Sequence, residues 1–448
     1  MPSTSPSDSH DDHNAPRRVW GATLLQALGR LWGAGCTLTL LWLAADALPL
    51  AGFGRFTFYL AAFAWLDSLA NMGTGQVAVQ WTAAARERTA DVLATARRVR
   101  LAAGGLGLAL VAGTAFAWDE PDAGWIVLAA LYPITHALEL SATVFQNRIA
   151  WGVPVAVRAA ASGLSLAGVA LLHARGEARP ALYLVAVAAG STLGNLLLHA
   201  ASRGFLARDR RGVARPVALG SFLRTALPLG LAGLCAQTYF YVDNLFIRAL
   251  EGDTALGHYN VAVRFMSWSI MLAQYVTHTA LPWLTRRHQA GQLGAAIDRL
   301  GPPLFALAGL ATGLLAPWSE LLLSIFGPEF TAAGASLRWL FAAAAVIYAG
   351  ALFATAVVAT GNMLPMLWIA AGGVLLNVAG NALAVPAMGI EGAALVTFLT
   401  ELFVALSAAW VLARSGAGPS AARAWSWAAG PLLFGLGWWL ASLLGASS

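Results

Sequence analysis

Long apolar runs recur along the whole chain, and they constrain its fold more than any other feature. A helix needs about 20 mostly apolar residues to cross the hydrocarbon core of a bilayer. Only 11% of the residues are charged, whereas soluble domains carry about 25%. The runs predict an all-α polytopic membrane protein with about 13 transmembrane helices. We place these helices at 24–45, 56–80, 101–118, 124–145, 154–173, 181–202, 222–250, 258–283, 302–326, 336–360, 366–385, 393–413 and 425–445.

The arginines indicate the orientation of the chain, because cytoplasmic loops are enriched in positive charge. The chain has no lysine, so all 27 basic residues are arginines. With a cytoplasmic N-terminus, only Arg55, Arg175 and Arg179 fall in external loops. Eighteen fall in cytoplasmic segments: Arg17, Arg18, Arg86, Arg88, Arg97, Arg98, Arg100, Arg148, Arg203, Arg208, Arg210, Arg211, Arg215, Arg286, Arg287, Arg299, Arg414 and Arg423.

The arginine-rich stretch after the sixth run divides the chain into two halves of six helices each. A weak repeat supports the division, because 52–61 resembles 255–264 and pairs Gly54 with Gly257 and Phe56 with Tyr259. Repeated halves are typical of transporters with a central site. The expected domains are a disordered cytoplasmic tail (1–20), an N-terminal bundle (21–202), a linker (203–221), a C-terminal bundle (222–413), and a linker with an extra helix (414–448).

Neither the tail nor the cysteines predict a metal or cofactor site. The tail is polar, and its His10 and His13 either bind a metal weakly or are simply solvated. Cys36 and Cys235 are isolated in apolar runs, which predicts neither a disulfide framework nor a metal site. The chain has no phosphate-binding P-loop, so we expect no direct use of ATP and no cofactor.

The stretch Tyr239–Arg264 places three charges in two successive helices: Asp243 and Arg248 in the first, and Arg264 in the second. An ionisable group inside a bilayer is expensive and is by default a functional hypothesis. We expect a cross-helix pair between Asp243 and Arg264, and a functional role for Arg264. Arg30, Arg158 and Arg248 lie near helix ends and either act in a cavity or extend to the headgroups.

Helical spacing places polar residues of several runs on one face each, which predicts a water-filled interior. Glu139 of the fourth run and Asp67 of the second are candidates for ion coupling, the alternative being structural pairing. The candidate cavity residues are Arg264, Arg30, Asp243, Arg248, Gln274 and His278. Because the guanidinium of arginine stays charged and binds phosphate with two hydrogen bonds, these arginines favour a phosphate-bearing anion as substrate.

Four stretches resemble the polysaccharide-transporter branch of the multidrug/oligosaccharidyl-lipid/polysaccharide exporter superfamily, which includes O-antigen and exopolysaccharide flippases. The stretches are V-D-N-L-F-I-R-A-L-E-G-D-T-A-L-G-H-Y-N-V-A-V-R-F (242–265), T-A-L-P-W-L-T-R (279–286), S-I-F-G-P-E-F-T-A-A-G-A-S-L-R-W-L (324–340) and N-A-L-A-V-P-A-M-G-I-E-G-A-A-L-V-T (381–397). The resemblance is closest in the second half of the chain.

The resemblance implies two six-helix bundles around a central cavity that opens alternately to each side of the bacterial cytoplasmic membrane. It implies transfer of a polyprenyl-diphosphate-linked oligosaccharide to the outer leaflet, with a polysaccharide polymerase and glycosyltransferases of the same pathway as partners. It identifies Arg264 and Asp243 as cavity residues, and Arg30 by position only. Membrane lipid is the expected surrounding, and no nucleic-acid partner is expected.

Two other functions stay open from the residues alone. An ion-coupled multidrug exporter of the same superfamily would be expected to have a cavity dominated by acidic groups. A membrane glycan polymerase or glycosyltransferase usually needs a sizeable loop outside the membrane, and no loop here exceeds about 20 residues. We therefore expect a transporter and not an enzyme.

Overall fold

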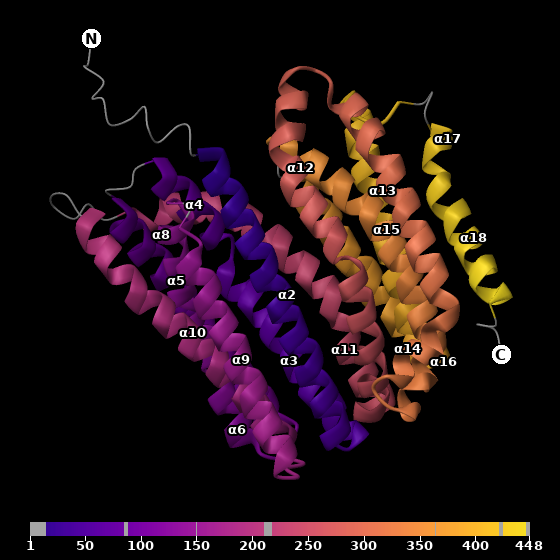
Figure 1. The fold of residues 1–448 in the computed structure, drawn as a ribbon, viewed down its shortest axis with the longest axis horizontal. Coiled ribbons are helices and arrows are strands. Elements are labelled where there is room, and N and C mark those ends of the chain that lie inside the picture. Colours follow the sequence, from indigo (N-terminus) through magenta and orange to yellow (C-terminus); the bar gives the residue numbers. More distant parts are fainter. Residues whose placement is uncertain are drawn as a thin grey trace. The chain divides into compact units, whose positions relative to one another are not determined.

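The computed structural model describes residues 15–84, 88–148, 150–209, 217–362, 364–420 and 424–444. Within these ranges every regular element is a helix and no strand occurs (Figure 1). The predicted all-α class is therefore confirmed. The predicted tail up to residue 14 lies outside the described residues, as do 210–216 of the predicted linker.

Nine of the described helical segments are long and apolar enough to cross a membrane. Two of them, α11 (Leu219–Ser269) and α16 (Leu364–Arg414), have 51 residues each and contain a sharp bend. All 13 predicted runs coincide with a described helix, part of one, or a series of short helices. The last run is occupied by α17 (Ala424–Trp427) and the 15-residue α18 (Ala429–Leu443).

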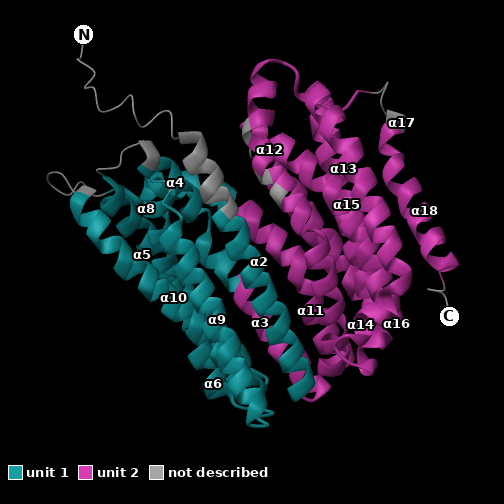
Figure 2. Ribbon diagram, in the orientation of Figure 1, with its two compact units in different colours: residues 1–47, 66–230 teal, residues 48–65, 231–448 magenta. Residues whose placement is uncertain are grey.

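The chain forms two compact units, which Figure 2 shows in separate colours. Unit 1 comprises residues 1–47 and 66–230, and unit 2 comprises 48–65 and 231–448. The helices wholly in unit 1 are α2 (Ala15–Ala47), α4 (Thr74–Ala84), α5 (Thr89–Ala117), α6 (Ala123–Ala129), α7 (Tyr132–Thr135), η2 (His136–Ser141), α8 (Ala142–Gln146), α9 (Gly152–Ala174) and α10 (Pro180–Asp209).

Unit 2 contains most of α11, all of α16 and the last helices of the chain. Its α3 (Leu50–Asn71) and α11 each continue into unit 1, at their C-terminal and N-terminal ends respectively. The boundaries of the two predicted bundles remain a prediction. The other helices of unit 2 are α12 (Met271–Gln289), α13 (Leu293–Leu315), η3 (Ala316–Trp318), α14 (Ser319–Ser324), η4 (Pro328–Ala333) and α15 (Gly334–Ala359).

The bends in α11 and α16 are tight reversals built on single glycines. Gly252 has φ 85° and ψ 178°, and Gly389 has φ 58° and ψ −138°. Only glycine adopts such angles readily, because it has no Cβ atom. The helices therefore continue almost to the turn, and the predicted gap between residues 250 and 258 is wrong. The reversal places Asp243 opposite Tyr259, 16 positions later.

Two runs that we predicted as continuous helices are interrupted in unit 1. The run 56–80 breaks at Met72 and Gly73, both of which have positive φ. A Cβ atom on Gly73 would lie 2.4 Å from the carbonyl oxygen of Ala226, so only glycine permits this close approach. The run 124–145 divides into α6, α7, η2 and α8, with a proline at the start of α7.

Candidate functional site

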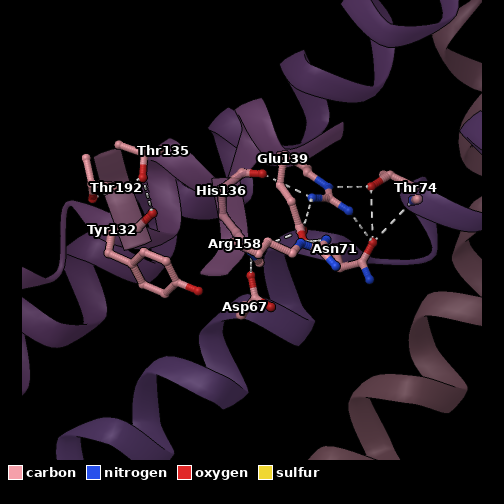
Figure 3. Close-up of polar contacts among 11 residues, drawn as sticks. Asp67, Asn71, Thr74, Tyr132, Thr135, His136, Glu139, Arg158 and Thr192 are labelled. Atoms are coloured by element: carbon pink, nitrogen blue, oxygen red, sulfur yellow. Dashed lines mark hydrogen bonds and ion pairs between the residues drawn. The ribbon is translucent and has the colours of Figure 1, made fainter. Parts of the chain in front are cut away.

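Polar side chains from five elements of unit 1 meet in one cluster, which we call the unit 1 polar network (Figure 3). Helices α3 and α4 supply amide, hydroxyl and carboxylate groups, while α5 and α9 each supply a guanidinium group. The 3₁₀ helix η2 supplies an imidazole and a second carboxylate. The network consists of Asp67, Asn71, Thr74, Arg100, His136, Glu139 and Arg158.

Arg100 is the centre of the network and is only 4% exposed. Its Nη2 donates a 2.7 Å hydrogen bond to Asn71 Oδ1, and its Nε donates a 2.9 Å bond to Thr74 Oγ1. Its Nη1 donates to the carbonyl oxygen of His136 at 3.1 Å and lies 3.6 Å from Glu139 Oε2. All three nitrogens are therefore engaged. The predicted helix start at residue 101, which puts Arg100 in the segment before it, is wrong, because α5 begins at Thr89 and Arg100 is buried within it.

Glu139 accepts contacts from three basic groups. Arg158 Nη2 donates to its Oε1 at 2.7 Å, and His136 Nε2 lies 3.1 Å from its Oε2, the oxygen that Arg100 also approaches. Glu139 therefore takes part in ion pairs, which agrees with structural pairing, one of the two alternatives for this residue. The other imidazole nitrogen of His136, Nδ1, contacts Asp67 Oδ1.

The imidazole of His136 thus lies between two carboxylates, Asp67 and Glu139. A neutral imidazole has one N–H donor, whereas the protonated ring has two. Only the protonated ring donates a hydrogen bond to both carboxylates. When His136 is neutral, the two guanidinium groups of the network balance its two carboxylates. The imidazole of His136 can therefore gain or lose a proton in this arrangement, and the network has no surplus positive charge for an anion.

A second buried cluster joins the two limbs of α11 in unit 2, about two helical turns from Gly252. Asp243 is 2% exposed and receives a 2.5 Å hydrogen bond at Oδ2 from Tyr259 Oη. Its Oδ1 accepts hydrogen bonds from the backbone N–H of Asn244 at 2.8 Å and from Asn244 Nδ2 at 3.0 Å. The Tyr259 hydroxyl also lies 3.3 Å from Thr397 Oγ1 on α16. Asp243 is therefore held by neutral donors.

The expected pair between Asp243 and Arg264 does not form. The second limb of α11 directs Tyr259 to Asp243, while Arg264 lies more than one helical turn further along. Arg264 is half-buried, and Tyr241 is its electrostatic neighbour. Among the described residues no carboxylate pairs with Arg264. Its positive charge is therefore uncompensated within the described protein.

Arg248 is the other predicted cavity arginine of α11, and it is held at the reversal. Its Nε donates to Asp253 Oδ1 at 2.9 Å, and its guanidinium lies 4.6 Å from the ring centroid of Phe58. Arg55 shares the same carboxylate, with its Nε 3.2 Å from Asp253 Oδ2. Two guanidinium groups therefore share the carboxylate of Asp253 here.

The remaining predicted cavity residues are less closely defined. Arg30 on α2 and Gln274 on α12 are exposed. His278 belongs to α12, but its side chain lies outside the described part of the structure. The substrate-binding assignments of these residues remain predictions.

Sequence reasoning missed Arg100 and Tyr259 as members of these clusters. The signal for Tyr259 was present in the repeat that pairs it with Phe56, since the added hydroxyl group marks a polar position. The spacing of three residues between Arg97 and Arg100 could have indicated a helix that continues towards Thr89.

Comparison with known proteins identifies the family and the fold. A family model described as polysaccharide biosynthesis protein matches residues 21–288. No curated protein matches the chain. The lipid II flippase MurJ in an inward closed conformation is similar in structure, with a TM-score of 0.68, 11% identity, and coverage of 95% of this chain and 98% of that chain.

Two further solved structures are similar to this chain. The MATE transporter VcmN of Vibrio cholerae has a TM-score of 0.62 and 16% identity, and the match covers 89% of this chain and 96% of that one. A MOP superfamily transporter of Pyrococcus furiosus has a TM-score of 0.62 and 14% identity, with coverage of 89% and 95%. At these identities the likeness shows the fold, which is that of MOP superfamily transporters. The family model spans well over half of the chain, which therefore belongs to the polysaccharide biosynthesis protein family.

Proposed function

We propose that this protein is a flippase for a polyprenyl-diphosphate-linked oligosaccharide. It moves this substrate from the inner to the outer leaflet of the bacterial cytoplasmic membrane by alternating access, with the N-terminus in the cytoplasm. The transported unit then serves the synthesis of O-antigen, capsule or exopolysaccharide. A polysaccharide polymerase and the glycosyltransferases of the same pathway are the partners that such a reaction requires.

The uncompensated charge of Arg264 is the observation that carries this proposal. Arg264 lies in a membrane-spanning segment and has no carboxylate partner among the described residues. A charge in that environment is unfavourable by several kcal/mol unless it is neutralised or hydrated. A diphosphate group supplies the missing negative charge and accepts two hydrogen bonds from one guanidinium group.

Neighbouring residues of unit 2 extend the proposed site. The two guanidinium groups of Arg55 and Arg248, which meet at Asp253, are the second place in unit 2 that we assign to an anion. Gln274 and His278 follow Arg264 on the next helix of unit 2, whereas Arg30 lies on α2 of unit 1 and stays a candidate by its position in the sequence only. We assign to Gln274 and His278 the contacts with the sugar units and the rest of the headgroup.

The unit 1 polar network is the proposed site of ion coupling. Protonated His136 donates a hydrogen bond to both Asp67 and Glu139. After loss of the proton, one of the two carboxylates receives no hydrogen bond from His136. A proton or small cation entering here changes the contacts between α3, η2 and α9. Such a change is what a transporter needs to bias one of its two orientations.

The test compares Arg264→Ala with Arg264→Lys in cells that depend on this protein for export. The leaflet of the lipid-linked oligosaccharide is measured with an impermeant sugar-modifying reagent. We expect Arg264→Ala to lower transfer at least tenfold at normal protein abundance. Arg264→Lys keeps the charge but loses the planar two-bond contact, so we expect an intermediate rate.

Arg338→Ala is the matched control, because Arg338 pairs with Glu320 at 2.7 Å and is not a proposed site residue. Its transfer rate should equal that of the wild type. If Arg264→Ala exports normally, the assignment of the diphosphate site is wrong. Intermediates that are already accessible outside in cells lacking the protein would favour the polymerase alternative.

The multidrug exporter alternative has one favourable observation, the structural likeness to MATE transporters. Efflux of cationic dyes separates the two proposals. We expect no dye efflux above that of cells without the protein. Dye efflux together with an unchanged oligosaccharide pool would replace the flippase by the drug exporter.

A further inference from the structure

The surface of unit 2 carries a groove between the two limbs of α16, at the ends farthest from Gly389. Its volume is about 420 Å³. None of its lining residues is charged. The residues are Asn362, Leu364, Pro365, Trp368, Ile369, Phe403, Ser407, Trp410 and Val411.

Two exposed tryptophans mark the position of this groove in the bilayer. Trp368 is 68% exposed and Trp410 is 60% exposed, one on each limb of α16. Tryptophan is enriched where the hydrocarbon core meets the headgroups. We infer that the groove opens at headgroup level, and Leu364 and Phe403 contribute to its apolar lining. With the predicted orientation, this is the cytoplasmic leaflet.

Arg414 ends α16 at the same end of the groove. Its guanidinium lies 5.1 Å from the ring centroid of Trp410, an arrangement that holds the charge in place. No carboxylate among the described residues pairs with Arg414. A neutral, apolar groove with one uncompensated cation at its mouth matches an apolar chain that ends in an anionic headgroup.

We propose that this groove binds an anionic phospholipid of the cytoplasmic leaflet. One acyl chain lies between Trp368 and Phe403, and the phosphate group contacts Arg414. A methylene group is close in size to a water molecule, which occupies about 30 Å³ in the liquid, so the groove has room for roughly a dozen methylenes. The inference depends on the predicted orientation but not on the flippase proposal, because the groove contains none of the proposed substrate residues.

The test uses photoactivatable lipids in reconstituted full-length protein. Phosphatidylglycerol and phosphatidylcholine, each with a diazirine in one acyl chain, are compared in vesicles, and the cross-linked peptides are identified by mass spectrometry. We expect phosphatidylglycerol to label the groove peptides about fivefold more than phosphatidylcholine, the preference that one arginine near the membrane surface supplies. Arg414→Gln should make the two lipids label equally.

Ser407→Phe fills the groove and should remove labelling by both lipids. Leu383→Phe is the matched control, because Leu383 lies on α16, is 78% exposed and is outside the groove. Even labelling of all exposed positions of α16 would show contact with bulk lipid only and overturn the proposal. An unchanged preference in Arg414→Gln would also overturn it. Stronger labelling by a photoactivatable polyprenyl phosphate than by phosphatidylglycerol would assign the groove to the transported lipid instead.

Discussion

Gly54 and Gly257, which occupy equivalent positions in the sequence repeat, pack directly against each other in unit 2. A Cβ atom on Gly54 would lie 3.0 Å from the backbone nitrogen of Gly257 and 1.8 Å from the carbonyl oxygen of Asp253. The contact joins α3 to the second limb of α11, next to the ion pair between Arg55 and Asp253. The two copies of the repeat therefore form one helix–helix interface, and their glycines allow the backbones to approach.

Gly54→Ala should destabilise the protein, because the new methyl group meets backbone atoms that cannot move aside. Overpacking of this kind typically costs about 1–3 kcal/mol. The midpoint of thermal unfolding in detergent measures the effect. Gly105→Ala is the control, because a Cβ atom at Gly105 meets nothing within 4 Å. Equal midpoints for the two variants would contradict the interface.

Gly252→Ala tests the backbone strain at the reversal of α11. A Cβ atom here meets no neighbour within 4 Å, so any loss of stability comes from φ 85° and ψ 178° alone. A residue other than glycine in this region of φ and ψ typically lowers the free energy of unfolding by about 1–3 kcal/mol. Gly220→Ala, within the same helix and equally open, should leave the unfolding midpoint unchanged or raise it. An unaffected Gly252→Ala variant would mean that the reversal has other angles.

Arg100→Gln should be the most damaging change in the unit 1 polar network. It removes the guanidinium group that donates hydrogen bonds to Asn71 and Thr74, and with it one of the positive charges near Glu139. Removing one partner of a buried ion pair costs about 3–5 kcal/mol. Arg98→Gln, two positions away and exposed, should change the unfolding free energy by less than about 0.5 kcal/mol. Similar losses for both variants would show that Arg100 is not buried in the folded protein.

Glu139→Gln should separate transport from the ion gradient, because the amide keeps the shape but cannot hold a proton or cation. In proteoliposomes, an imposed proton or sodium gradient should accelerate transfer by the wild type and leave the variant unaffected. Asp67→Asn should act in the same way. Glu320→Gln is the control, since Glu320 is an exposed carboxylate paired with Arg338. A gradient response that survives in Glu139→Gln would place the coupling elsewhere.

The helices could be predicted from the sequence because their apolar length is a local property of the chain. The residues that interrupt them were harder to interpret. Gly73 and Gly252 look alike in the sequence, yet one ends a helix against Ala226 and the other reverses the chain direction. Which glycine makes a turn depends on backbone contacts with segments far along the chain.

Of the candidate sites, the positions of Asp67 and Glu139, each on the polar face of its own helix, followed from residue spacing; that both contact His136 is decided by the structure. The partner of Asp243 did not follow from spacing. The chain reversal at Gly252 decides that Asp243 meets Tyr259 and that Arg264 is left without a carboxylate.

The amino-acid pattern alone therefore determines that this is a helical membrane protein and that several charges, among them Asp243 and Arg264, lie inside its apolar helices. The tertiary structure decides which of those charges neutralise each other. The physical reason is that apolar burial depends on each residue and its helix, whereas an ion pair requires two groups within about 4 Å. That distance is set by turns and helix contacts that no local stretch of sequence specifies.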